Sequence, residues 1–298
     1  MDGFAADIKS AEVNGAALWY LDRGEGESVV FVHGTSQDGR TWNHQIDAVA
    51  TRYRSIAYSR RYARPNEHIP TGQDDQMEPH VDDLLQMLRR LDAVPAHLVG
   101  SSWGGFICLL AALREPSFVR TLVLCEPPVF PLFISNNPGP GEIARLFLRG
   151  PIDAVRIVRF AVGVLEPTVK AYRAGNLEDG RRIFGSALLG KQGFESMPDD
   201  RKRMLDENKS AEVAQLLGAG FPPLRAADVR GLSTRTLLVG GDRSPAVFHA
   251  TLLGKLANLL PNAERVEIPE ASHLMHEENP DAFNQALFSF LGHDQQGS

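Results

Sequence analysis

The sequence predicts an α/β fold in which a mostly parallel sheet is covered by helices on both faces and carries an inserted helical cap. Short apolar runs alternate with segments of helical periodicity, and the central runs are apolar throughout, as in strands buried on both faces. A long later stretch holds helical patterns and chain breakers without a convincing strand. We expect residues 1–130 and 228–298 to form the core and 131–227 the cap.

Composition limits the possible function. The chain has 298 residues, 43% of them hydrophobic, and a net charge of −6 without a dense Lys/Arg cluster, which argues against a nucleic-acid partner. It contains no apolar run of about 18 residues, so we expect no membrane span. Residues 1–7 lack the pattern of a signal peptide, and Cys108 and Cys125 lie in apolar stretches that do not suggest a disulfide. We therefore expect a cytoplasmic protein.

Local patterns predict each element in turn. The Asn14-Gly15 turn signal predicts a hairpin, and apolar residues spaced by three and four between Met77 and Leu91 predict an amphipathic helix. The expected strands are 8–13, 17–22, 28–32, 54–58, 97–99, 121–125, 236–239 and 264–268. The expected core helices are 39–50, 77–91, 106–113, 249–260 and 280–291. The expected cap helices are 143–148, 152–165, 168–174, 177–189 and 198–217.

The sequence Gly-Ser-Ser-Trp-Gly at residues 100–104 lies between a strand and a helix and fits a sharp turn with a serine at its apex. Such a turn needs glycine two residues before and two after the nucleophile, because side chains there would collide. Ser102 meets this condition and Ser101 does not. The alternative is a plain or phosphate-binding turn, but no lysine lies nearby, as a phosphate loop would require.

A serine nucleophile needs a base that a carboxylate orients. His273 follows the last expected strand and precedes the last helix, which places it at the edge of the sheet where Ser102 lies; His276 is the nearest rival. For the acid, Glu126 directly follows an apolar strand and precedes two prolines, so it needs a partner in a half-buried place. Asp242, after the penultimate expected strand, is the runner-up acid.

Backbone amides that stabilise an oxyanion are expected at two positions. One is the amide of Trp103, at the start of the helix after the turn, where the helix dipole favours negative charge. The second is the amide of Thr35, in the loop after strand 28–32. The alternative for His33-Gly34 in that loop is an ordinary strand end.

These residues together resemble the α/β-hydrolase superfamily. The resemblance rests on His33-Gly34-Thr35, the turn 100–104, Glu126, and Ser272-His273 followed by Glu278-Asn279-Pro280. The placement of this acid, right after the sixth strand and 24 residues after the nucleophile, is similar to its placement in some haloalkane dehalogenases and in the fungal lactonases that open zearalenone. Dehalogenases and epoxide hydrolases of this fold use an aspartate nucleophile, so the serine implies acyl transfer. Two departures could reshape the pocket: Ser59-Arg60-Arg61-Tyr62 replaces the usual Asp-x-Arg-Gly, and Glu270 replaces a glycine.

The sequence thus predicts a serine hydrolase that needs no cofactor and no metal and cleaves a carboxylic ester or lactone through Ser102, His273 and Glu126. A carbon–carbon hydrolase or a perhydrolase on the same scaffold is the alternative within enzymes, and a non-catalytic small-molecule receptor is the alternative from another class. Four phenylalanines of the cap region suggest an apolar substrate, although core packing would explain them as well; they are Phe130, Phe133, Phe147 and Phe160.

Overall fold

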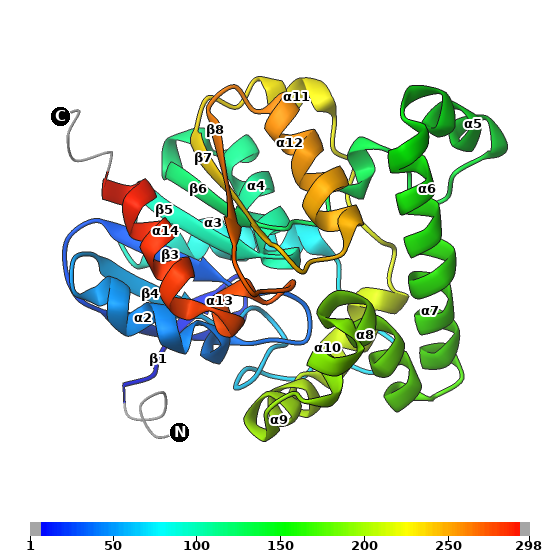
Figure 1. Cartoon of the computed structure of the whole chain (residues 1–298). Coiled ribbons are helices and arrows are strands. Elements are labelled where there is room, and N and C mark those ends of the chain that lie inside the picture. The colour runs from blue at the N-terminus through cyan, green and yellow to red at the C-terminus, as the bar shows by residue number, and fades with distance from the viewer. Residues whose placement is uncertain (1–6, 293–298) are drawn as a thin grey trace.

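The computed structural model describes residues 7–292, which form an eight-stranded sheet with helices on both faces (Figure 1). Residues 1–6, on which most of the signal-peptide argument rests, and residues 293–298 lie outside the described part. The strand order is β1-β2-β4-β3-β5-β6-β7-β8. The strands are β1 (Lys9–Val13), β2 (Ala16–Arg23), β3 (Ser28–Val32), β4 (Arg54–Tyr58), β5 (Ala96–Ser101), β6 (Val119–Cys125), β7 (Arg235–Gly241) and β8 (Ala263–Ile268).

The pairing confirms the predicted mostly parallel sheet. β1 and β2 form the expected hairpin, β2 pairs with β4 antiparallel, and every further pair is parallel. In β3, Val30 and Val32 point into the core on one face while Val29 and Phe31 point into the core on the other. Because both faces are covered, the strand is apolar at every position after Ser28, which explains the hydrophobic run Val29–Val32 in the sequence.

Helices pack on the two faces of the sheet as expected. One face is covered by α3 (Met77–Arg90), α4 (Trp103–Arg114) and α12 (Leu253–Leu259), and the other by α2 (Asn43–Ala50) and α14 (Pro280–Gly292). The 3-10 turn η1 (Gly39–Trp42) precedes α2, and α13 (Met275–Glu278) precedes α14. No helix within residues 7–292 combines the length and the apolar character needed to cross a bilayer.

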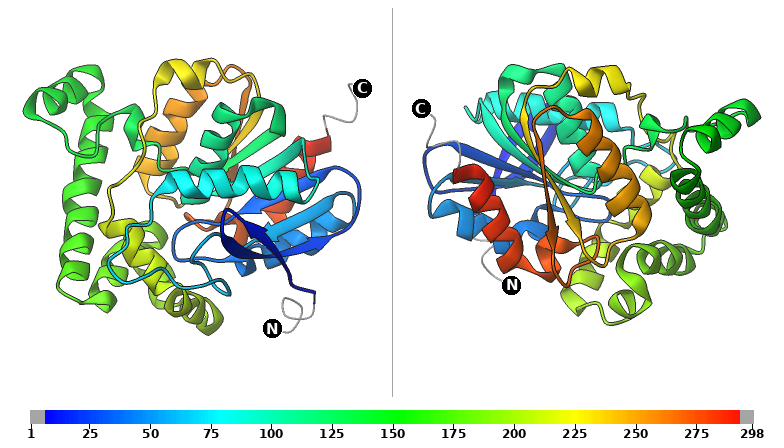
Figure 2. Two further views of the ribbon diagram at one scale, coloured as in Figure 1. Left: turned by 180° about the vertical axis from the view of Figure 1, so that it is seen from behind. Right: turned by 45° about the horizontal axis from the view of Figure 1, so that its top comes forward.

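Within the described chain, residues 126–234 between β6 and β7 contain helices and no strand; we call them the helical insertion. It lies beside the sheet, on the side opposite the C-terminal end of α14 (Figures 1 and 2). Its helices are α5 (Pro140–Arg149), α6 (Pro151–Phe160), α7 (Glu166–Arg173), α8 (Leu177–Glu195), α9 (Asp199–Glu207), α10 (Lys209–Leu217) and α11 (Ala226–Arg230). It also holds two short turns, η3 (Phe130–Leu132) and the π-helical η4 (Ala161–Leu165).

The expected helix over 198–217 is interrupted at Asn208, between α9 and α10. The Asn208 side chain donates to Asp38 Oδ2 at 2.7 Å and accepts from the Arg64 amide at 2.8 Å. Both partners belong to the core, so the break in the helix is a point at which the helical insertion is attached to the sheet domain.

Candidate active site

Ser102 lies in the turn between β5 and α4, with backbone angles φ 51° and ψ −119°. This region is strained for a residue with a side chain, and such strain concentrates at functional sites. A Cβ added at Gly100 would lie 2.6 Å from the Gly104 carbonyl oxygen, and one added at Gly104 would lie 2.3 Å from the Val32 carbonyl oxygen. The turn therefore needs both glycines, as the sequence predicts. Ser101 remains buried at the end of β5, and its Oγ has no hydrogen-bond partner within residues 7–292.

Glu126, the first residue after β6, is fully buried beside His273. Its Oε2 lies 2.6 Å from His273 Nδ1, and its Oε1 accepts from the Gly241 amide at 3.2 Å. The Glu126 backbone has a φ of 45°, and its amide donates to the Val239 carbonyl at 3.2 Å. Both carboxylate oxygens therefore have donors, which a buried charge requires. This arrangement orients the imidazole with Nδ1–H toward the carboxylate and Nε2 away from it.

Ser102 and His273 line one cavity of about 70 Å3. His273 Nε2 is buried and has no hydrogen-bond partner in the described part of the chain. A general base needs an unpaired acceptor that can reach the serine, and serine–histidine hydrogen bonds of this kind often form only when substrate is bound. The apolar side chains on the cavity wall are Phe184, Leu188, Leu189, Phe194, Met197, Leu205 and Leu274.

The two rival residues occupy other places. The Asp242 carboxylate accepts from the Ala271 amide at 3.1 Å, and backbone amides of Glu270 and Ala271 hold the pKa of this exposed carboxyl below its usual range. Asp242 thus stabilises the loop that leads to His273. His276 is buried against Trp42, with ring centroids 4.3 Å apart, and burial lowers its pKa well below the usual value. It does not line the cavity of Ser102.

Thr35 and Trp103 both lie next to Ser102. Thr35 is on the cavity wall, and its amide makes no hydrogen bond to another residue of the described chain. The preceding Gly34 passes so close that an added Cβ would lie 3.2 Å from Ser102 Cβ. Trp103 is the first residue of α4, so its amide is one of those without an intrahelical carbonyl partner. Two amides without a hydrogen-bond partner in the described part of the chain therefore belong to residues near Ser102.

The aromatic side chains of the cavity are not among the residues that the sequence pattern singles out. Phe184 and Phe194, both on α8, line it, whereas none of the four phenylalanines singled out from the sequence does. Phe130 and Phe160 instead stack on each other in the core, with ring centroids 5.8 Å apart. No local sequence signal shows that α8 lines the cavity of Ser102, because this depends on how the helical insertion packs on the sheet domain.

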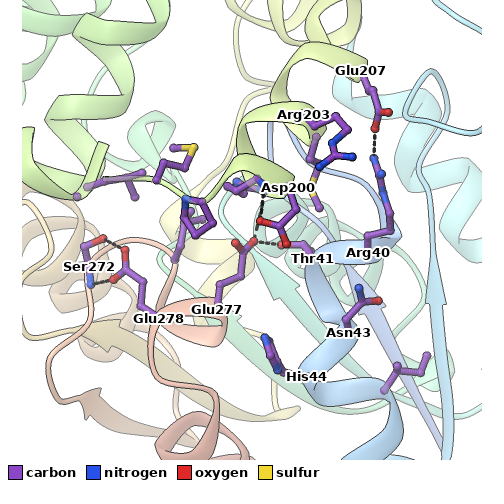
Figure 3. Close-up of a pocket in the computed structure, with 18 of the residues that line it drawn as sticks. Arg40, Thr41, Asn43, His44, Asp200, Arg203, Glu207, Ser272, Glu277 and Glu278 are labelled. Carbon is purple, nitrogen blue, oxygen red and sulfur yellow. Dashed lines mark hydrogen bonds and ion pairs between the residues drawn. The ribbon is translucent and has the colours of Figure 1, made fainter. Parts of the chain in front are cut away.

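A larger cavity of about 1550 Å3 adjoins the small one, between the sheet domain and the helical insertion (Figure 3). The two cavities share four wall residues: Leu189, Met197, Arg201 and Leu274. The polar wall of the larger cavity contains ion pairs between different elements. In one of them, Arg40 of η1 lies 2.5 Å from Glu207 of α9 (Figure 3). No group of three or more potential metal-ligating side chains occurs among residues 7–292.

The fold and the residues around Ser102 agree with what comparison with known proteins finds. A model of the alpha/beta hydrolase family matches residues 29–286, and the chain therefore belongs to this family. The chain is 27% identical to the putative non-heme bromoperoxidase BpoC of Mycobacterium tuberculosis, over 92% of this chain and 97% of that protein. It is 26% identical to the non-heme chloroperoxidase CPO-A1 of Kitasatospora aureofaciens, over 93% and 97%.

Solved structures show the same fold. An esterase from Thermogutta terrifontis superposes with a TM-score of 0.72 at 21% identity, covering 96% of this chain and 98% of the esterase. Est816, an N-acyl homoserine lactone degrading enzyme, superposes with a TM-score of 0.61 at 22% identity, covering 95% and 100%. The predicted α/β-hydrolase fold is confirmed.

Proposed function

We propose that this hydrolase cleaves a carboxylic ester or lactone with Ser102 as nucleophile, His273 as base and Glu126 as the acid that orients the base. One observation carries the proposal. The buried contact of 2.6 Å between Glu126 and His273 leaves Nε2 of the imidazole unpaired on the wall of the cavity that Ser102 also lines. Esterase and lactone-degrading proteins with this fold support the choice of bond.

In the proposed mechanism, Ser102 Oγ attacks the carbonyl carbon while His273 Nε2 takes the hydroxyl proton. Glu126 stabilises the imidazolium, and the amides of Thr35 and Trp103 bind the oxyanion of the tetrahedral intermediate. His273 then gives its proton to the leaving oxygen and an acyl-serine remains. An ester releases its alcohol at this point, whereas an opened lactone keeps the new hydroxyl on its acyl chain. Water, activated by the same histidine, hydrolyses this ester and frees the carboxylic acid and Ser102.

The apolar wall around Ser102 fits a compact hydrocarbon acyl group or lactone ring, because burial of each methylene contributes about 0.8 kcal/mol. In this proposal the larger cavity is the route by which substrate reaches the serine, since both cavities share part of their wall. The helical insertion, which supplies α8 and α9 to these walls, acts as a cap on the site.

The adjacent serines provide a matched test. Ser102→Ala should lower kcat for a p-nitrophenyl ester by at least about 10³-fold, whereas Ser101→Ala should leave it within a few-fold, because it removes only an unpaired buried hydroxyl. A fluorophosphonate should label the wild-type chain and Ser101→Ala but not Ser102→Ala. Turnover by Ser102→Ala at close to the wild-type rate would refute the proposal. A panel of esters and lactones graded by chain length and ring size then identifies the substrate class.

Perhydrolysis is a second candidate, because the relatives at 26–27% identity are named as haloperoxidases. Hydrogen peroxide would replace water in attacking the acyl-serine and yield a peracid, with the same residues in the same roles. Bromination of monochlorodimedone distinguishes perhydrolysis from ester hydrolysis. In acetate buffer with peroxide and bromide, a perhydrolase forms peracetic acid, which oxidises bromide to the brominating agent. Activity that disappears in Ser102→Ala supports the perhydrolase, and hydrolysis of esters without bromination supports the esterase or lactonase.

A further inference from the structure

Arg60, two residues after β4, is a fully buried cation that the proposed mechanism does not use. We propose that Arg60 is a positioning residue that holds the loop of Thr35 and the ring of Trp103 in place, so that both oxyanion-binding amides stay aimed at one point. The proposal rests on the function given above. It adds a residue that touches no substrate and acts through the backbone of the oxyanion site.

Arg60 makes three hydrogen bonds to the residues that precede Thr35. Its Nε donates to the His33 carbonyl at 3.0 Å, and its Nη2 donates to the Gly34 carbonyl at 2.9 Å. Its backbone amide donates to His33 Nε2 at 2.9 Å. His33 Nδ1 lies 2.9 Å from the Gly34 carbonyl, which fixes the proton on Nδ1. The planar guanidinium therefore holds two successive peptide units, and the second of them, Gly34–Thr35, contains the Thr35 amide itself.

The guanidinium of Arg60 also packs on the ring of Trp103, the residue that carries the second oxyanion-binding amide of the proposal. Its carbon lies 4.5 Å from the centroid of the Trp103 ring, at cation–π distance. His80 meets that ring edge-on from α3, with centroids 4.9 Å apart and an interplanar angle of 83°. Trp103 begins α4, so fixing its side chain also restrains the first turn of the helix.

A buried charge needs a compensating partner, and the structure supplies one through a histidine. Arg60 Nη1 lies 3.4 Å from His80 Nδ1, and His80 Nε2 lies 2.7 Å from Asp75 Oδ1. The other Asp75 oxygen accepts from Gln215 of the helical insertion at 2.7 Å. Burial lowers the pKa of Arg60 to about 10, and the Asp75 charge opposes this shift. Arg60 therefore stays charged at neutral pH.

The neighbouring Arg61 shows that this arrangement is specific to Arg60. Arg61 points the other way, where its Nε and Nη2 pair with Asp83 at 2.8 and 2.7 Å, and Nη2 also donates to the Asn14 carbonyl at 3.2 Å. Within residues 7–292, Arg61 makes no hydrogen bond to His33, Gly34 or Thr35. Arg60 and Arg61 thus provide a matched pair of adjacent, hydrogen-bonded arginines, of which only one reaches the oxyanion site.

The test compares Arg60→Lys and Arg60→Met with Arg61→Lys and Arg61→Met, using a p-nitrophenyl ester that the wild-type chain hydrolyses. Displacement of an oxyanion donor costs about 10²-fold in rate. We expect Arg60→Met to lower kcat by about 10²-fold and Arg60→Lys by at least about 10-fold, with KM changed less than about three-fold. A lysine cannot reach both carbonyls and stack on Trp103 at once. The Arg61 variants should keep kcat within about two-fold.

A transition-state analogue separates positioning from general loss of structure. A trifluoromethyl ketone forms a tetrahedral adduct on Ser102, so its Ki should rise by the same factor as kcat falls, while the Ki of the matching methyl ketone should stay unchanged. Unchanged kcat in both Arg60 variants overturns the inference, as does an equal loss in the Arg61 variants or equal weakening of both ketones. If Arg60→Met does not fold, Arg60→Lys alone decides. A wild-type chain that hydrolyses no ester refutes the proposed function instead.

Discussion

Glu126 Oε2 lies 2.6 Å from His273 Nδ1, although 147 residues separate the two in the chain. Glu126 follows β6 and His273 follows β8, and both strands run parallel to β7 between them. The carboxyl ends of all three strands therefore lie at one edge of the sheet. Of the two candidate acids that the sequence leaves open, Glu126 is the one that contacts His273, and this contact supports its proposed role.

Glu126→Gln should lower kcat by about 10³- to 10⁴-fold, with KM little changed. An amide in place of the carboxylate can donate to Nδ1, which stabilises the wrong tautomer of His273, and it cannot stabilise the imidazolium. Steady-state kinetics with a p-nitrophenyl ester measure the effect.

Asp242→Asn is the control for this substitution. It removes a charge from an exposed loop but keeps an oxygen that can accept from the Ala271 amide, so kcat should stay within a few-fold of wild type. The opposite pattern, with only Asp242→Asn inactive and both chains folded by circular dichroism, would show that Asp242 is the acid.

Phe194→Ala should change the acyl-chain preference of the enzyme. The Phe194 ring lines the cavity of Ser102, and its removal opens space for a longer chain. Each added methylene that is buried there contributes about 0.8 kcal/mol, or about four-fold in kcat/KM. The ratio of kcat/KM for butanoate and hexanoate esters to that for acetate should therefore rise. The measurement is a p-nitrophenyl ester series.

Phe147→Ala serves as its control because Phe147 is a partly exposed ring on α5 outside the cavity. Its ester profile should match the wild type. Identical profiles for both variants would mean that the acyl group does not lie against Phe194.

The free energy of unfolding should fall as the pH falls below about 6.5, the usual pKa of histidine. Burial lowers the pKa of His33, His80 and His276 in the folded chain. Between these lowered values and 6.5, the unfolded chain binds more protons than the folded chain. Stability is therefore lost on acidification, by up to about 1.4 kcal/mol per pH unit for each histidine. The measurement is the free energy of unfolding by urea at several pH values between about 7.5 and 5.5. This interval lies above the pH range in which ordinary carboxylates titrate, so the change reports on the histidines.

His276→Gln tests this assignment, since His276 is buried outside the cavity of Ser102. The variant should be less stable at pH 7.5 because it loses the stacking on Trp42, but its stability should fall less steeply with acidification. An unchanged slope would show that His276 does not contribute to the pH dependence.

Much of the fold follows from local sequence patterns. Apolar runs, helical spacing and the Asn14-Gly15 turn predict nearly every strand and core helix, because each signal is contained within a few adjacent residues. The interruption at Asn208 was not predicted, because its cause lies in distant partners, Asp38 and Arg64. The helix propensity of residues 198–217 depends on local sequence alone and does not reflect these contacts.

The sequence by itself determined the class of fold and the place of Ser102, since the steric need for Gly100 and Gly104 is local. It also placed His273 on the loop after the last strand. Only the tertiary structure decided which carboxylate meets His273, which rings line the cavity, and that Arg60 binds the loop before Thr35 while Arg61 pairs with Asp83. These outcomes depend on strand register and on the direction in which each loop leaves the sheet, which bring together residues far apart in the chain.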